Sequence, residues 1–192
     1  MINSKYALIS VIEDRMNIVL TNEQLDYIFS ENQKLLMTTI RRYGKDFITA
    51  IKIATHLILK NDYKIGVFCF GEYVAKEMIK KIKIILEILD AHDLIESCNT
   101  NPYKITVCNN SVLFITSSTQ DCRGYAFDEA YIIEFFHKQG INGIINEVLA
   151  TLVYDNNYKL NIIGTPLESV PIDNILNMSD LKHIKVDDII YY

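Results

Sequence analysis

The chain has 192 residues, of which 49% are hydrophobic, and this is enough to form one domain with a substantial core. Its net charge of −5 excludes a generally basic nucleic-acid coat, so any DNA contact would need a local basic patch. No apolar run reaches about 18 residues and no signal-peptide pattern is present, which favours an intracellular protein with no membrane partner. The cysteines are far apart and no histidine lies at metal-ligand spacing, so zinc and disulfides are not expected.

The apolar pattern predicts strands alternating with helices. Thr21 can cap a short helix that runs through Ser30, and the segment 35–40 has the composition of a buried strand. After a turn, apolar residues from Phe47 onward recur at helical spacing and predict a helix to about Lys60. Further elements are expected in chain order: a strand at 64–70, a helix at 75–89, a β-hairpin at 103–116, a short strand at 125–127, a helix at 141–153, a strand at 158–163 and an edge strand within 183–191. We expect an α/β fold of three layers, similar to P-loop NTPases, with a mainly parallel twisted sheet and helices on both faces.

The segment Arg41-Arg42-Tyr43-Gly44-Lys45-Asp46 lies between a predicted strand and a predicted helix, where a phosphate loop would lie. Such a loop surrounds the phosphates with backbone N–H groups, neutralises them with a lysine and holds Mg²⁺ through a hydroxyl after that lysine. Gly44 and Lys45 fit this pattern, so residues 39–46 are the candidate nucleotide loop. Two features depart from it, because the first glycine is missing and Asp46 replaces the hydroxyl. The alternative is a surface turn with a capping glycine.

The pair Asp128 and Glu129 follows the predicted short strand at 125–127. A carboxylate at the end of a strand can hold Mg²⁺, and a second one can orient and deprotonate a water. Asp128 is therefore the candidate metal ligand and Glu129 the candidate base. This hypothesis predicts that the Lys45 amine and the Asp128 carboxylate lie within reach of a hydrogen bond or one water. The alternative is a pair of acids in the first turn of a helix.

A third segment, Ile162-Ile163-Gly164-Thr165-Pro166, places a hydroxyl at the end of a predicted strand. The carboxyl ends of parallel strands meet at one edge of a sheet, so Thr165 is expected beside the other two segments. There it could sense the γ-phosphate and couple its loss to movement. The alternative is an ordinary exit from a strand into a loop, broken by Gly164 and Pro166.

The segment 41–45 resembles the phosphate loop of viral terminase large subunits, the motors that pump DNA into the capsids of herpesviruses and tailed phages. In that family a basic residue three positions before the glycine replaces the first glycine of the general pattern. The resemblance covers about residues 20 to 170 and implies that Arg41 contacts the γ-phosphate region, that Thr165 couples hydrolysis to DNA movement, and that Gln24 reads the adenine. It continues through Asn110-Ser111-Val112-Leu113-Phe114-Ile115, Cys122-Arg123-Gly124, Asp128-Glu129-Ala130-Tyr131 and Gly164-Thr165-Pro166.

The resemblance implies a single terminase-like ATPase domain over residues 1–192, which binds ATP with Mg²⁺ and couples hydrolysis to translocation of double-stranded DNA. Its implied partners are the DNA, a portal protein and other terminase subunits, with the domain in a homo-oligomeric ring. Its implied location is the cytoplasm or nucleus of the infected host, and transiently the procapsid. Few residues follow Pro166, so we expect no nuclease domain and no DNA cleavage by this chain.

Asp46 limits what can be expected of the isolated chain. A carboxylate near the phosphates repels them, so we expect slow or absent ATP hydrolysis, although a carboxylate is itself a good magnesium ligand. Two alternatives stay open: the first motor domain of a DNA or RNA helicase, and a P-loop scaffold that does not hydrolyse ATP. The first needs a second motor domain for which the chain is too short. Candidate DNA contacts are Arg123 and the lysines 76, 80, 81 and 83, which could instead form a solvated helix surface.

Overall fold

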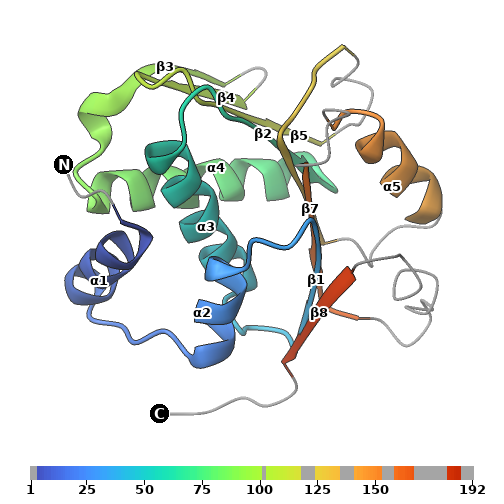
Figure 1. The fold of residues 1–192 in the computed structure, drawn as a ribbon, viewed down its shortest axis with the longest axis horizontal. Coiled ribbons are helices and arrows are strands. Elements are labelled where there is room, and N and C mark those ends of the chain that lie inside the picture. The colour runs from blue at the N-terminus through green and yellow to red at the C-terminus, as the bar shows by residue number, and fades with distance from the viewer. Residues whose placement is uncertain are drawn as a thin grey trace.

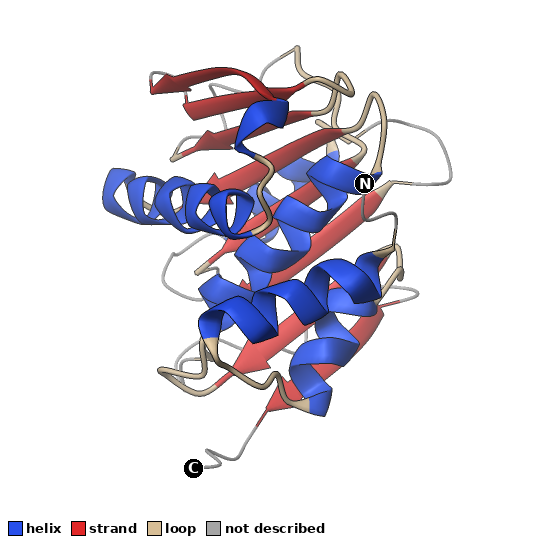
Figure 2. Cartoon of the chain, turned by 90° about the vertical axis from the view of Figure 1, so that its left-hand side faces the viewer, coloured by secondary structure: helices blue, strands red, loops and turns tan. Residues whose placement is uncertain are grey.

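Eight strands form one sheet in the part of the chain that the computed structural model describes, which is residues 4–100, 103–117, 124–134, 141–152, 158–166 and 181–186. In chain order the strands are β1 (Lys34–Thr39), β2 (Lys64–Cys69), β3 (Ile95–Thr100), β4 (Tyr103–Val107), β5 (Val112–Thr116), β6 (Glu129–Ile133), β7 (Lys159–Gly164) and β8 (Leu181–Val186). Their order across the sheet is β3-β4-β5-β2-β6-β7-β1-β8. Figure 2 shows them side by side behind a layer of helices.

Most neighbouring strands run parallel. The pairs β1·β7, β1·β8, β2·β5, β2·β6 and β6·β7 are parallel, and only the pairs β3·β4 and β4·β5 at one end are antiparallel within the described residues. Parallel strands need crossover connections, and α3 lies in the one from β1 to β2 and α5 in the one from β6 to β7. The carboxyl ends of β1, β6 and β7 therefore lie at the same edge of the sheet, and the predicted mainly parallel α/β fold is confirmed.

Helices cover both faces of the sheet (Figure 1). They are α1 (Lys5–Met16), α2 (Asn22–Phe29), α3 (Lys45–Leu59), α4 (Glu72–Ile88) and α5 (Ile141–Leu149), with a short 3-10 helix at His92–Leu94. One apolar core lies between the sheet and α1 to α4 and contains Ile51 and Tyr131. A second core lies under α5 and contains Phe127 and Val148. None of the helices in the described ranges is long and apolar enough to cross a membrane.

Local signals explain where several elements begin. The Thr21 hydroxyl accepts a hydrogen bond from the Gln24 backbone, as predicted for the start of α2. The Gln24 side chain also accepts one from the Thr21 backbone, and the two bonds form a capping box. The predicted hairpin is present as β4 and β5, and Asn110 in its turn has a left-handed φ of 63°.

The predicted short strand at 125–127 is wrong. Phe127 forms only an isolated bridge to Leu152, and the strand β6 begins at Glu129. All five side chains of β6 are buried, because helices cover both faces of this central strand. Helix α1 and strand β3 were not expected from the sequence. Arg123 lies outside the described residues.

Candidate functional site

The connection from β1 to α3 has the backbone of a loop that can hold an anion. Gly44 is the residue before α3, with a left-handed φ of 84°, and Arg42 has a φ of 68°. A Cβ on Gly44 would meet nothing within 4 Å, so glycine is favoured here by the backbone conformation and not by a lack of space. The N–H groups of Lys45 and Asp46 begin α3 ahead of its first backbone hydrogen bonds, which run from Phe47 and Ile48 to the Gly44 carbonyl, and this end of the helix carries the positive end of its dipole. This end of α3 therefore suits a phosphate.

Lys45 meets a carboxylate from a distant segment. Its Nζ lies 2.7 Å from Oε1 of Glu134, and the lysine side chain is 13% exposed. Glu134 directly follows β6 and has a left-handed φ of 58°. Strand β7 separates β6 from β1, and all three are parallel, so the residues after their ends share one edge of the sheet. The lysine of the candidate nucleotide loop and an acid are thus brought together, but the acid is Glu134.

Asp46, the residue after the loop lysine, lies between two cations. Its Oδ1 is 3.9 Å from Nζ of Lys45, and its Oδ2 is 3.7 Å from Nζ of Lys81 on α4. Lys81 is therefore turned toward the loop and does not belong to a solvated lysine surface. Lys80, in contrast, pairs with Glu77 at the surface of the same helix.

Buried polar atoms without hydrogen bonds gather at this edge. Within the described residues, Thr39 Oγ1, Asp46 Oδ1 and Thr165 Oγ1 are buried and have no hydrogen-bond partner. Thr39 ends β1 and Thr165 follows β7, which pairs with β1. An unsatisfied buried polar group costs about 1–3 kcal/mol, so the concentration of such groups is typical of a site for a polar ligand. Thr165 lies at the same edge as the loop at 41–46, as the sequence predicted, but not beside Asp128 and Glu129.

The donors at this edge fit Mg²⁺ held together with phosphates. Asp46 and Glu134 both approach Lys45, and Asp46 Oδ1 is a buried oxygen without a hydrogen bond. Magnesium in proteins commonly uses one or two carboxylates and completes its shell with water and substrate phosphates. No group of three or more acidic, histidine or cysteine side chains able to hold a metal occurs in the described part of the chain. A metal here would therefore depend on the nucleotide.

Gln24 lies beside the loop but has partners within the chain. Its Nε2 donates to the Tyr43 carbonyl at 3.3 Å, and its Oε1 accepts from the Thr21 backbone at 3.0 Å. The Tyr43 hydroxyl is also 2.8 Å from Oγ1 of Thr21. These contacts attach the start of α2 to the loop, and a role for Gln24 in reading adenine stays a prediction. Arg41 and Arg42 are exposed on the loop.

Asp128 and Glu129 lie at the opposite edge of the sheet. Glu129 is the first residue of β6, whereas Glu134 follows its last residue. Asp128 Oδ2 accepts from the Lys64 backbone at 2.8 Å, and the Asp128 N–H donates to the Lys64 carbonyl, so Asp128 fixes the start of β2. The predicted convergence of Asp128 with Lys45 is therefore wrong. The reason is that the buried strand follows the Asp-Glu pair and does not precede it.

Glu129 is instead the centre of a buried polar network. Its side chain is 0% exposed, accepts from the Tyr131 hydroxyl at 2.7 Å and from Asn161 at 3.0 Å, and lies 2.7 Å from Nδ1 of His56. Burial opposes ionisation of Glu129, but His56 and the nearby ammonium groups of Lys52 and Lys60 outweigh it and hold its pKa below the usual range. A buried carboxylate with these partners stabilises the fold, and its geometry does not support a role as catalytic base.

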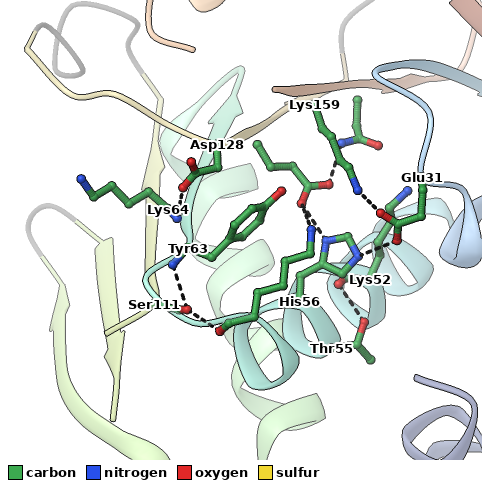
Figure 3. A network of polar contacts seen from close by, with 12 residues as sticks. Glu31, Lys52, Thr55, His56, Tyr63, Lys64, Ser111, Asp128 and Lys159 are labelled. Atoms are coloured by element: carbon green, nitrogen blue, oxygen red, sulfur yellow. Dashed lines mark hydrogen bonds and ion pairs between the residues drawn. The ribbon is translucent and has the colours of Figure 1, made fainter. Parts of the chain in front are cut away.

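His56 links Glu129 to the surface. Its Nε2 lies 2.9 Å from the Lys5 amine, and burial lowers its pKa to about 4, so the ring is neutral at pH 7. With the lysine donating to Nε2, the proton of the ring is on Nδ1, where it donates to Glu129. Glu31 lies on the outer side of this network and pairs with Lys5 and Lys159. Figure 3 shows Glu31 beside Lys159 and the His56 ring.

Glu134 is a candidate site residue that the sequence pattern did not indicate. The four residues before it, 130–133, are all apolar, and together with Glu129 they have the usual length of a strand. Three residues at 125–127 are fewer than an average strand contains. Greater weight on this longer apolar run would have placed the strand at 130–133 and the acid at 134.

Solved structures with the same fold are ATPase domains and large terminases of phages. The large terminase ATPase domain of Thermus phage P74-26 has a TM-score of 0.66 at 11% identity, over 91% of this chain and 83% of that chain. The large terminase of a thermophilic bacteriophage in complex with ADP has a TM-score of 0.69 at 13% identity, over 87% of this chain and 45% of that chain. The N-terminal domain of the DNA packaging ATPase of bacteriophage phi29 has a TM-score of 0.61 at 11% identity, over 87% of this chain and 95% of that chain.

These likenesses establish the fold. The described architecture is the α/β fold of phage terminase ATPase domains, with a mainly parallel sheet between two layers of helices. The chain spans less than half of the length of the thermophilic-phage large terminase. No protein-family profile matches the sequence. No curated protein matches it either.

Proposed function

We propose that this chain is the ATPase domain of a viral genome-packaging motor of the terminase type. The observation that carries the proposal is the meeting of Lys45 and Glu134, 2.7 Å apart, with Thr165 at the same edge of the sheet. The fold shared with phage packaging ATPases supports it, as do the complexes of one such terminase with ADP and with ATP-gamma-S.

Different residues at this edge would bind the phosphates, activate the water and hold the metal during phosphoryl transfer. The N–H groups at the start of α3 and the Lys45 amine hold the phosphates. Glu134 takes the role of base that the sequence suggested for Glu129: it orients the attacking water and accepts its proton. Asp46 would hold Mg²⁺ through its buried Oδ1, and the metal would supply neutralisation of charge on the phosphates. Thr165 follows β7 between these groups and would sense the γ-phosphate.

The wider assignment follows from the same proposal. The domain would translocate double-stranded DNA as part of a homo-oligomeric ring, together with a portal protein and other terminase subunits, in the cytoplasm or nucleus of an infected host and transiently at the procapsid. Motors of this kind commonly complete their sites with an arginine from a neighbouring subunit. The isolated chain is therefore expected to turn over ATP slowly or not at all.

Nucleotide binding tests the proposal without the rest of the motor. The affinity for ADP and for ATP-gamma-S in Mg²⁺ would be measured by calorimetry for the wild type, Lys45→Ala and the control Lys104→Ala on β4, toward the far end of the sheet. We expect the wild type and the control to bind alike and Lys45→Ala to bind at least about tenfold more weakly, since it loses a charge-assisted contact. No wild-type binding, or equal binding by Lys45→Ala, would contradict the proposal.

Asp46 favours a second candidate function. A carboxylate in the place of the usual hydroxyl is also compatible with a motor fold that has lost hydrolysis and persists as an assembly scaffold. In that case the calorimetry would detect no Mg²⁺-dependent binding of either nucleotide. Binding with Mg²⁺ would favour the motor.

A further inference from the structure

The two carboxylate oxygens of Asp46 have different surroundings. Oδ2 is 3.7 Å from the Lys81 amine, whereas Oδ1 is buried, is 3.9 Å from the Lys45 amine and accepts no hydrogen bond from any described residue. Asp46 and Lys81 are both about one-third exposed, so water only partly screens the pair. One oxygen is thus paired with α4 and the other is turned toward the nucleotide loop.

This position creates an electrostatic problem that Lys81 can solve. A carboxylate directly after the loop lysine repels the phosphates that the loop binds, and the repulsion grows as water is excluded. A cation on the outer side of that carboxylate cancels most of its charge without occupying the ligand side. The pair would then be close to neutral, like the hydroxyl that usually follows the loop lysine.

Other side chains show that Lys81 is placed differently from its neighbours on α4. Lys80 is 66% exposed and pairs with Glu77 on its own helix, whereas Lys81 is 33% exposed and reaches across to α3. The buried Cys69 thiol at the end of β2 is close enough to Asp46 and Lys81 for both charges to affect its pKa. Its pKa is raised to about 12, first by burial and then by Asp46, with Lys81 opposing.

We propose that Lys81 is a positioning residue for nucleotide binding: it neutralises Asp46 and holds Oδ2, which leaves Oδ1 toward the phosphates as the metal ligand. The proposal rests on the proposed nucleotide site. Where the usual hydroxyl is replaced by the charged Asp46, Lys81 on α4 supplies the opposite charge. Asp46 and Lys81 then act as a unit, and the loss of Lys81 should matter only while Asp46 is present.

The test is a double-mutant cycle on the full chain, with ADP affinity measured by calorimetry in Mg²⁺ and in EDTA. In EDTA, Lys81→Met should bind ADP on the order of tenfold more weakly than the wild type, because the Asp46 charge is no longer cancelled; neighbouring groups couple by such amounts. In Mg²⁺ the loss should shrink to about twofold, since the metal itself offsets the carboxylate. In an Asp46→Thr background, Lys81→Met should lower affinity no more than the control Lys80→Met.

Further variants separate charge from packing. Lys81→Arg keeps the cation and should retain wild-type affinity in EDTA, and thermal melting would verify that each variant is folded. Equal binding by Lys81→Met and Lys80→Met in EDTA would overturn the inference while leaving the nucleotide site intact, as would a loss in Lys81→Arg as large as in Lys81→Met. A wild type that binds no ADP in either condition would overturn both this inference and the proposed function.

Discussion

The Lys45 amine lies 2.7 Å from the Glu134 carboxylate because β6, β7 and β1 are parallel neighbours whose carboxyl ends share one edge. In open α/β sheets ligands bind outside this edge. The acidic pair Asp128 and Glu129 lies at the start of β6 and so at the other edge. The two edges have different chemistry, with unsatisfied polar groups at the first and a closed polar network at the second.

The two glutamates at the ends of β6 predict different mutant phenotypes. Glu134→Gln should leave nucleotide affinity within about threefold and lower ATP turnover by about 100-fold or more, as expected for a lost base. Glu129→Gln should lower the free energy of unfolding by about 3 kcal/mol, because the buried Lys52 and the nearby Lys60 lose their counter-charge and an amide cannot accept all the hydrogen bonds that the carboxylate accepts. Turnover would be measured under conditions in which the wild type is active, and stability by urea titration. A Glu129→Gln variant of wild-type stability that binds nucleotide without turnover would contradict the assignment.

Substitution of Gly44 by alanine should weaken nucleotide binding, whereas the same substitution at Gly124 should not. Both Gly44 and Gly124 have left-handed φ values, 84° and 87°, and a Cβ on either would meet nothing within 4 Å. Each alanine variant should therefore lose about 1–2 kcal/mol of stability from backbone strain. Only Gly44→Ala should also weaken ADP binding, by about tenfold, since only Gly44 shapes the loop. Thermal melting and calorimetry would separate the two effects, and equal ADP affinity in both variants would contradict the role of the loop.

The buried His56 predicts a pH dependence of stability. Its pKa is about 4 in the folded chain and ordinarily 6.5, so between these values the unfolded chain binds a proton that the folded chain excludes. The free energy of unfolding should therefore fall as pH falls through this window, by at most about 3 kcal/mol. Lys5 keeps its charge throughout the window, since its pKa, lowered by burial, is about 8.

Two histidine variants isolate this effect. His56→Gln should flatten the decrease in unfolding free energy between pH 6.5 and 4.5, whereas His92→Gln, which changes an exposed side chain, should retain it. Urea titrations at several pH values would measure both. Identical pH profiles for the two variants would show that His56 is not the group responsible.

DNA binding is predicted to depend on salt. The acidic chain would hold duplex DNA through a local basic surface, and each phosphate contact releases counterions. The affinity for a labelled duplex should therefore fall by at least about tenfold between 50 and 200 mM salt, measured by fluorescence anisotropy. A flat salt response would exclude this mode of binding.

Local signals in the sequence were sufficient to predict the strand, turn and helix around the candidate nucleotide loop. The apolar run before Thr39, the glycine at position 44 and the helical spacing after Lys45 predicted β1, the turn and α3. The capping residues of α2 and the turn of the β4–β5 hairpin were predicted in the same way. In these segments, neighbouring residues determine the structure.

The acidic edge could not be predicted in the same way. Glu129 is a charged residue inside a fully buried strand, and it is tolerated there because His56, Tyr131 and Asn161 satisfy it. Two of these partners come from distant segments, so no local pattern reveals them. The Asp-Glu pair therefore suggested a strand end, and Glu134 was overlooked. The pairing of Asp46 with Lys81 also depends on the packing of α4 beside α3.

A structure of the chain with ATP-gamma-S and Mg²⁺ tests the central claim most directly, because it shows which edge of the sheet holds the nucleotide. We predict phosphates at the start of α3, with the Lys45 amine in contact, the metal on Asp46, and Glu134 within one water of the γ-phosphate. Asp128 and Glu129 should keep their present partners. Phosphates beside Asp128, or a nucleotide bound away from Gly44 and Lys45, would contradict the account.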